Sequence, residues 1–288
     1  MTQRLSRPVR EMTWTVRGRA FAGLQWGEPV GRPVVFLHGF LDHAGAWSRV
    51  AEGLPGWRLA YDHRGHGRSA HVSAADDDAF VTYHFSEYLA DLDGLVAQLG
   101  PVVLVGHSMG GTIATMYAGV RPDRVLGVVS VDGLGLSDGA EGAVTRMAEF
   151  LDGVERLPVN KRFDSVEDAA ARLRRTHPSL DEAWSVELAA RSLRALDGGY
   201  SWSWDARHRL RSPVPYRQDH HARFLRRIRC PVMSVHPEHS PFHDHDVAAL
   251  EREIAALQIV VIANSGHMVH LDAPERLTEC IASFLGSL

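Results

Sequence analysis

The stretch Gly106-His107-Ser108-Met109-Gly110 combines a hydroxyl nucleophile with the glycines that a very tight turn requires. An apolar, β-branched run over 101–105 precedes it and predicts a buried strand, and an apolar helical pattern follows it to about Val120. A serine on a sharp strand-to-helix turn has its Oγ exposed above the sheet, at the positive end of the helix. The residues therefore predict a nucleophile elbow with Ser108 as the attacking group.

A serine hydroxyl is a poor nucleophile at neutral pH and needs an adjacent base. His267 lies in the segment 264–270, directly after the last predicted strand, where a loop can return over Ser108. His270, in the same segment, is the alternative base. The base also needs a carboxylate that fixes its tautomer and stabilises the imidazolium. The chain order serine, aspartate, histidine favours His267 as the base.

The elements that must position these residues alternate between strand and helix along most of the chain. Strands are predicted over 12–18, 19–26, 33–37, 57–61, 101–105, 125–131, 231–236 and 258–262, and helices over 43–52, 85–99, 246–257 and 274–285. This alternation predicts an α/β fold with a mostly parallel central sheet and helices on both faces. In such sheets the site lies at the carboxyl ends of the strands, where His38, Asp62, Ser108, Asp132 and His267 all fall.

The alternation stops over 134–216. Helical patterns appear over 141–156, 165–176 and 180–196, followed by a turn-rich aromatic stretch over 197–205. We therefore predict one core domain made of 1–133 and 217–288, interrupted by an inserted helical lid over 134–216. The aromatic residues of this lid either line an apolar substrate pocket or form the lid's own small core; they are Trp184, Tyr200, Trp202 and Trp204. For the substrate site we predict Trp202, Trp204 and His107.

Four segments resemble, in order, the signature segments of the α/β-hydrolase superfamily: His38-Gly39, the run 62–69, the run 106–110 and Gly266-His267. The resemblance covers nearly the whole chain outside 134–216. The run Leu37-His38-Gly39-Phe40-Leu41-Asp42, together with the lid, is similar to the serine-hydrolase-like (kraken-type) branch. The resemblance implies the α/β-hydrolase fold and a hydrolase that needs no cofactor.

The acid of the predicted triad departs from the pattern of many members of this superfamily. These members carry an aspartate after the strand equivalent to 231–236, where this chain has Ser240, which cannot hold a negative charge. Other members place the acid one strand earlier, and this chain has Asp132 at the end of that strand. We therefore predict Asp132 as the acid and keep Glu238 as the alternative.

Two N–H donors must face the oxyanion of a tetrahedral intermediate. Met109, the residue after the nucleophile, supplies one from its backbone, and the family pattern implies Phe40 as the second donor. The resemblance also implies that His38 supports this loop by hydrogen bonding. Asp62 and Arg64 are predicted to hold loops beneath the site.

These residues predict a serine hydrolase, of the esterase or thioesterase type (EC 3.1), that cleaves a carboxylic ester, lactone or thioester of a small, partly apolar substrate. The reaction passes through an acyl-enzyme on Ser108. Hydrolysis of a carbon–carbon bond and cofactor-free perhydrolysis are alternatives on the same fold. A catalytically weak ligand-binding protein is the alternative of another class, which the serine at position 240 favours.

Composition bounds the remaining expectations. The 288 residues carry a net charge of −4 and 45% hydrophobic residues, which support a sizeable core and give no sign of nucleic-acid binding. No apolar run is long enough to cross a membrane, and two cysteines imply no disulfide framework, so we expect a cytoplasmic monomer or homodimer. The histidines at 236, 239, 243 and 245 match no standard zinc spacing, so we expect neither a metal nor a cofactor.

Overall fold

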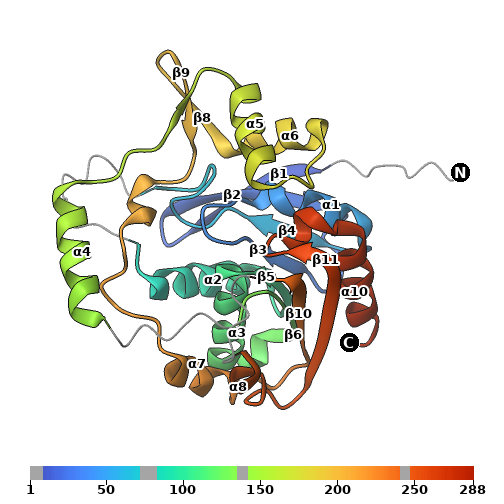
Figure 1. Ribbon diagram of the computed structural model, residues 1–288. Coiled ribbons are helices and arrows are strands. Elements are labelled where there is room, and N and C mark those ends of the chain that lie inside the picture. The colour runs from blue at the N-terminus through green and yellow to red at the C-terminus, as the bar shows by residue number, and fades with distance from the viewer. Residues whose placement is uncertain (1–8, 72–82, 135–141, 241–246) are drawn as a thin grey trace, which may run out of the picture.

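The computed structural model describes residues 9–71, 83–134, 142–240 and 247–288, and a single eight-stranded sheet forms its centre (Figure 1). The strand order is β1-β2-β4-β3-β5-β6-β10-β11. Their bounds are β1 Arg10–Val16, β2 Arg19–Trp26, β3 Val34–Leu37, β4 Arg58–Tyr61, β5 Val102–His107, β6 Val125–Val131, β10 Val232–His239 and β11 Leu257–Gly266. Strand β2 runs antiparallel to both of its neighbours, and every other pair is parallel. The predicted α/β fold with a mostly parallel sheet is therefore confirmed.

Helices cover both faces of this sheet (Figure 1). They are α1 Ser48–Gly53, α2 Phe85–Leu99, α3 Met109–Val120, α7 Gln218–Leu225, α8 Val247–Glu251, α9 Val269–Asp272 and α10 Pro274–Gly286. A hydrophobic core lies on each face of the sheet, and successive side chains of β5 enter the two cores in turn. Leu104 packs with α2 and α3, while Val103 and Val105 pack with α1 and α10. All six residues of β5 are buried, as expected for a central parallel strand.

The sheet brings the ends of β3, β5 and β6 side by side. Leu37 of β3 pairs with Gly106 of β5, and His107 of β5 pairs with Val131 of β6. The residues that follow these three strands therefore emerge at one edge of the sheet. Ser108 and Asp132 are the first residues beyond β5 and β6, so they start from adjacent positions.

The segment between β6 and α7 contains more strand than the sequence predicts. Its helices are α4 Ala143–Glu155, α5 Val166–Thr176 and α6 Glu182–Ser192, and its strands β7 Arg162–Phe163, β8 Leu193–Leu196 and β9 Gly199–Trp202 form a separate antiparallel sheet. The helix predicted to run to residue 196 ends at Ser192. Asp197 and Gly198 form a two-residue hairpin connection, with φ at 71° for the glycine, and this turn pairs β8 with β9.

The helix predicted over 246–257 is also shorter than expected, because α8 ends at Glu251. The backbone N–H of Val232 donates to Ala256 O at 2.8 Å, and β11 begins at the next residue. The chain must therefore be extended at Ala256 and Leu257 in order to pair with β10, although the spacing of apolar residues over 246–257 favours a helix.

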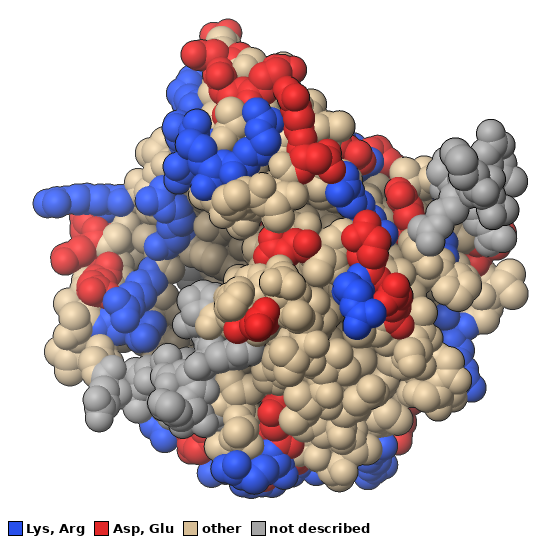
Figure 2. Space-filling model, turned by 45° about the vertical axis from the view of Figure 1, so that its right-hand side comes forward, with Lys and Arg blue, Asp and Glu red and all other residues tan. Residues whose placement is uncertain are grey.

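The surface carries charges of both signs. Figure 2 shows one face hollowed below the upper part of the molecule, with Lys and Arg side chains gathered along one edge of the hollow and Asp and Glu side chains above it. Among the helices in the described ranges, none has the length and apolar character needed to cross a bilayer.

Candidate active site

Ser108 occupies a strained turn between β5 and α3. Its φ of 51° and ψ of −119° lie where non-glycine residues are rare. A Cβ on Gly106 would lie 2.2 Å from the Gly110 carbonyl oxygen, and a Cβ on Gly110 would lie 2.2 Å from that of Leu37. The two glycines are therefore required for strand and helix to approach this closely, and they leave the half-buried Ser108 at the first turn of α3.

Asp132 directly follows the neighbouring strand β6 and is buried. Ser108 N donates to Val131 O at 2.9 Å, and Asp132 N donates to Val235 O at 2.9 Å, so both backbones are fixed by the sheet. Asp132 also has a positive φ of 45°, which turns its side chain out of the strand. The structure therefore places a buried carboxylate directly beside the nucleophile turn.

His267 comes from the other end of the chain and meets this carboxylate. Its Nδ1–H donates to Asp132 Oδ2 at 2.6 Å. The Asp132 side chain is 0% exposed and the His267 side chain is 23% exposed, so the imidazole is the member of the pair that a substrate can reach. Because Nδ1 carries the proton, Nε2 is the unprotonated ring nitrogen, the form that a general base needs.

The two alternatives for the acid and the base lie elsewhere. Glu238, 46% exposed, accepts a hydrogen bond from Asn264 N at 2.7 Å. His270 is buried on α9, stacks on Trp47 at 4.9 Å and pairs with Asp42 at 3.3 Å. Desolvation raises the pKa of Asp42, but its close contact with His270 and the charge of that ring outweigh it and bring the value down to about 2. The geometry therefore favours Asp132 with His267.

Ser240, which stands where many relatives of this fold have the acid, contacts the carboxylate that replaces it. Its Oγ donates to Asp132 Oδ2 at 2.7 Å. Sequence reasoning recognised only that Ser240 cannot be the acid. The sequence holds one signal for this contact. Ser240 follows β10, which pairs with β6, so its hydroxyl starts near Asp132 at the end of β6.

His107 does not lie where a substrate contact needs it. The side chain is 1% exposed, and its Nε2–H donates to the backbone carbonyl of His267 at 2.8 Å. The two rings lie 4.6 Å apart. The predicted substrate contact is therefore wrong, because His107 is buried behind the histidine loop and supports the backbone of His267 instead.

The loop after β3 runs alongside Ser108. A Cβ on Gly39 would lie 3.4 Å from Ser108 Cβ, and the next residue, Phe40, has a side chain that is 51% exposed. His38 anchors this loop, since its Nδ1–H donates to Gly39 O at 2.7 Å and its Nε2 accepts from His63 N at 2.9 Å. The Phe40 and Met109 backbones thus flank the nucleophile, and their oxyanion role stays a prediction.

The residues of the 62–69 run hold loops, as the sequence predicts. Asp62 accepts hydrogen bonds from Ala44 N at 2.7 Å and from Arg68 N at 2.9 Å. Arg64 donates to both carboxylate oxygens of Asp91, at 2.5 and 2.6 Å. These charge-assisted hydrogen bonds hold the 62–69 run against the loop at Ala44 and against α2.

The tryptophans of the segment between β6 and α7 differ in their surroundings. Trp202 packs edge-on against Phe163 at 4.7 Å, within a small cluster that includes Ala169 and Ala189. Trp184 is 4% exposed, with the Arg49 guanidinium 4.8 Å from its ring centre. Trp202 is only partly buried, so its packing against this cluster leaves its predicted substrate contact a prediction. The Trp204 carbonyl accepts from Asn160 at 2.5 Å, and its predicted substrate contact stays a prediction.

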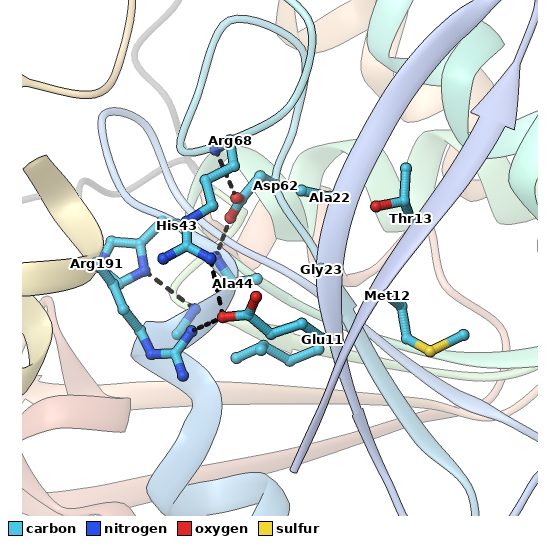
Figure 3. Close-up of a pocket in the computed structure, with 12 residues that line it drawn as sticks. Glu11, Met12, Thr13, Ala22, Gly23, His43, Ala44, Asp62, Arg68 and Arg191 are labelled. Atoms are coloured by element: carbon cyan, nitrogen blue, oxygen red, sulfur yellow. Dashed lines mark hydrogen bonds and ion pairs between the residues drawn. The ribbon is translucent and has the colours of Figure 1, made fainter. Parts of the chain in front are cut away.

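A polar cavity of about 240 Å³ lies apart from this centre, against β1, β2 and the start of η1 Ala44–Trp47 (Figure 3). Figure 3 shows Arg68 and Arg191 converging on Glu11, which they approach to 2.8 and 3.8 Å. Arg191 belongs to α6, so its ion pair with Glu11 links the segment between β6 and α7 to β1. The cavity is lined by opposite charges that already neutralise each other.

Comparison with known proteins gives a consistent result. The family model described as the α/β hydrolase fold matches residues 32–274. A serine hydrolase-like protein of Danio rerio is 29% identical over 99% of this chain and 90% of its own length, and lipase LipV of Mycobacterium tuberculosis is 30% identical over 88% and 93%. The solved thioesterase domain from the curacin biosynthetic pathway is 30% identical with a TM-score of 0.84, over 95% of this chain and 99% of that domain. The predicted resemblance to the serine-hydrolase-like branch is confirmed.

Proposed function

The chain belongs to the α/β-hydrolase family and is a hydrolase of that type, and from this premise we propose that it cleaves a carboxylic ester, lactone or thioester through an acyl-enzyme on Ser108. The observation that carries the proposal is the 2.6 Å hydrogen bond from His267 to the buried Asp132, next to the strained turn of Ser108. Relatives named as a lipase, an esterase and a thioesterase domain support the same class of bond.

The first half of the reaction forms the acyl-enzyme. His267 Nε2 removes the Ser108 Oγ proton while Oγ attacks the substrate carbonyl carbon. Asp132 holds the imidazole in the required tautomer and stabilises the imidazolium that results. The tetrahedral intermediate collapses, the carbon–oxygen or carbon–sulfur bond breaks, and His267 gives its proton to the leaving group.

The second half of the reaction uses water. His267 removes a proton from water, the hydroxide attacks the acyl-enzyme carbonyl, and Ser108 Oγ leaves with the proton returned by His267. In both halves the oxyanion accepts hydrogen bonds from the backbone N–H groups of Met109 and Phe40. A donor of this kind contributes roughly 3–4 kcal/mol to stabilising the transition state.

The acyl part of the substrate is partly apolar. Phe40 follows Gly39, which lies against Ser108, and leaves 51% of its side chain exposed. An exposed ring on a loop that passes beside the nucleophile can offer an apolar surface to the group attached to the reacting carbonyl. Trp204 is a further candidate for this surface.

A fluorophosphonate probe followed by intact mass measurement tests the proposal. We expect one adduct on the natural chain and none on Ser108→Ala. Ser212→Ala is the matched control, since Ser212 is an exposed serine whose hydroxyl donates to Val214 O. This variant keeps the adduct.

Hydrolysis rates of the same proteins on a panel of esters and thioesters then identify the type of bond that the enzyme cleaves. Hydrolysis that depends on Ser108 supports the proposal. A folded natural chain that neither takes the probe nor cleaves any member of the panel would overturn it, and would leave a ligand-binding protein on a hydrolase fold as the function.

A further inference from the structure

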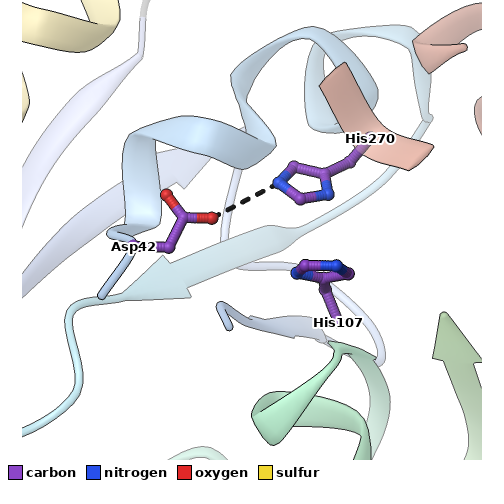
Figure 4. A group of neighbouring side chains, drawn as sticks. All are labelled: Asp42, His107 and His270. Carbon is purple, nitrogen blue, oxygen red and sulfur yellow. Dashed lines mark ion pairs between the residues drawn. The ribbon is translucent and has the colours of Figure 1, made fainter. Parts of the chain in front are cut away.

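Three side chains from distant parts of the chain meet behind the Ser108 centre (Figure 4). Asp42 lies in the loop after β3, His107 ends β5, and His270 belongs to α9. One ligand atom from each lies within 4.8 Å of the other two. The two imidazoles are 0–1% exposed and the Asp42 side chain is 13% exposed, so the cluster is almost fully buried.

The tautomer of His107 is fixed by its neighbour. Its Nε2 faces the carbonyl oxygen of His267 at 2.8 Å, and a carbonyl oxygen only accepts, so Nε2 carries the proton. Nδ1 is then a bare lone pair, buried and without a hydrogen-bond partner among the described residues. A Cβ on Gly39 would lie 2.7 Å from this nitrogen, so the glycine keeps its surroundings open. Metal-ligating histidines typically have this arrangement, with the second ring nitrogen donating to a backbone carbonyl.

Asp42 is oriented in a comparable way. Its Oδ1 accepts from His43 N at 2.9 Å, which leaves Oδ2 directed at the cluster. Oδ2 forms an ion pair with His270 Nε2 at 3.3 Å. Within the described part of the chain, no further group donates to Oδ2, and His270 Nδ1 has no hydrogen-bond partner. A buried polar atom without a partner, such as His107 Nδ1, costs about 1–3 kcal/mol, and here it lies within 4.8 Å of the Asp42–His270 pair.

We propose that Asp42 Oδ2, His107 Nδ1 and His270 Nε2 bind one divalent transition-metal ion, with Zn²⁺ as the best match. Two imidazoles and one carboxylate suit zinc and its neighbours, whereas calcium and magnesium prefer oxygen donors alone. Donors on a tetrahedral zinc ion lie about 3.3 Å apart. The Asp42–His270 separation already has this value. The distances from His107 to the other two ligand atoms, which are at most 4.8 Å, shorten by up to about 1.5 Å on binding.

The site has a structural role. The ion ties together the loop that flanks Ser108, the strand that carries it and the helix that follows His267. Entry is from the Asp42 side, the one partly exposed member, where solvent completes the coordination. Because the folded chain alone assembles these ligands, binding raises the temperature of unfolding. This inference does not depend on the bond that the enzyme cleaves.

The test uses the full chain freed of metal with a chelator and titrated with ZnCl₂ alone. We expect about one ion per chain by calorimetry and a rise of several degrees in Tm. Asp42→Asn and His270→Gln each weaken binding by about tenfold or more. The matched control is His239→Gln, which removes a histidine that also lies beside a carboxylate, Glu238 at 3.7 Å, but is 71% exposed. This variant keeps the natural affinity.

A second experiment locates the bound ion in the natural chain, so its result does not depend on how the variants fold. In crystals of the natural chain with ZnCl₂, anomalous scattering at the zinc edge is expected to place one peak between Asp42, His107 and His270. Zinc found only on surface histidines, unchanged affinity in a folded Asp42→Asn, or no binding by the natural chain each overturns the proposal. In these cases the three side chains form an ion-pair cluster without metal.

Discussion

Ser240 donates its hydroxyl hydrogen to Asp132 Oδ2 at 2.7 Å, the same oxygen that accepts Nδ1–H of His267 at 2.6 Å. Two donors thus converge on one carboxylate oxygen that is shielded from water. A hydrogen bond to a carboxylate stabilises its charged form and limits its rotation. Ser240 is therefore placed to hold Asp132 in the orientation that His267 requires.

Replacing Asp132 by Asn tests the assignment of the acid. The amide can donate to Nδ1 but carries no charge, so His267 loses both the required tautomer and the stabilisation of its imidazolium. We expect kcat to fall by roughly a hundredfold or more with the fold retained. Steady-state kinetics on an ester substrate, with circular dichroism as the folding check, measures this.

Glu238→Gln is the matched variant for that experiment. Glu238 accepts from Asn264 N at the exposed end of β10, so its loss leaves turnover within about twofold of the natural value. A result in which Glu238→Gln is the damaging change and Asp132→Asn is silent would reverse the assignment.

Ser240→Ala isolates the hydroxyl described above. Removing one hydrogen bond to a charged group costs about 1.5–3 kcal/mol when the group stays buried. We expect kcat/KM to fall by roughly tenfold, while Ser240→Thr, which keeps the hydroxyl, retains most of the activity. Equal losses in both variants would mean that packing rather than the hydrogen bond matters at position 240.

The position of Ser240 also predicts a partial rescue. The double variant Asp132→Asn with Ser240→Asp places a carboxylate at position 240, near the His267 imidazole. Many relatives of this fold have the acid at this strand end. We expect kcat of the double variant to be at least about tenfold higher than kcat of Asp132→Asn. A double variant no faster than Asp132→Asn alone would show that position 240 cannot orient His267.

The parts of the fold that local pattern determines were predictable. The β-branched run 101–105 and the glycines around Ser108 define a strand and a turn within a dozen residues, and both were found. The hairpin of β8 and β9 was missed, because the apolar spacing over 180–196 suits a helix while the Asp197-Gly198 turn decides otherwise. Short apolar runs do not separate helix from strand by period alone.

Contacts between distant loops were not predictable in the same way. Residue type and chain order identify Asp132 and His267 as candidates. Only the folded chain shows that these residues, 135 positions apart in the sequence, form a 2.6 Å hydrogen bond. The burial of His107 behind the His267 loop has the same origin. Both depend on the paths of loops at the carboxyl edge of the sheet, for which sequence periodicity carries no signal.

Trp202 belongs to a packed cluster, so its removal should act on stability. Trp202→Ala deletes the ring that contacts Phe163 at 4.7 Å. Because this ring is only partly buried, we expect the free energy of unfolding to fall by about 1–3 kcal/mol, less than for a fully buried tryptophan. Denaturant titration measures the loss. Preference among esters of different acyl length should stay unchanged in Trp202→Ala, and a clear shift in that preference would return Trp202 to the substrate pocket.

Buried histidines make the protein sensitive to mild acid. Burial lowers the pKa of His63 to about 3, of His208 to about 3 and of His221 to about 4. In the unfolded chain these groups take up protons near pH 6.5, whereas the native state keeps them neutral. Stability from these groups is therefore complete above about pH 6.5 and is lost as the pH falls toward the folded-state values. Each histidine costs about 2 kcal/mol by pH 5.

We therefore expect the free energy of unfolding to fall steeply between pH 6.5 and 5, measured by urea titration at each pH. The three groups together remove about 6 kcal/mol, a large part of the total stability of a typical domain. His208→Gln keeps a donor for Gly65 O and an acceptor for Tyr88, the two partners of this ring, at 3.2 Å each. The slope of stability against pH in this variant should decrease by about 1.4 kcal/mol per pH unit. An unchanged slope would show that protonation of His208 does not contribute to acid unfolding.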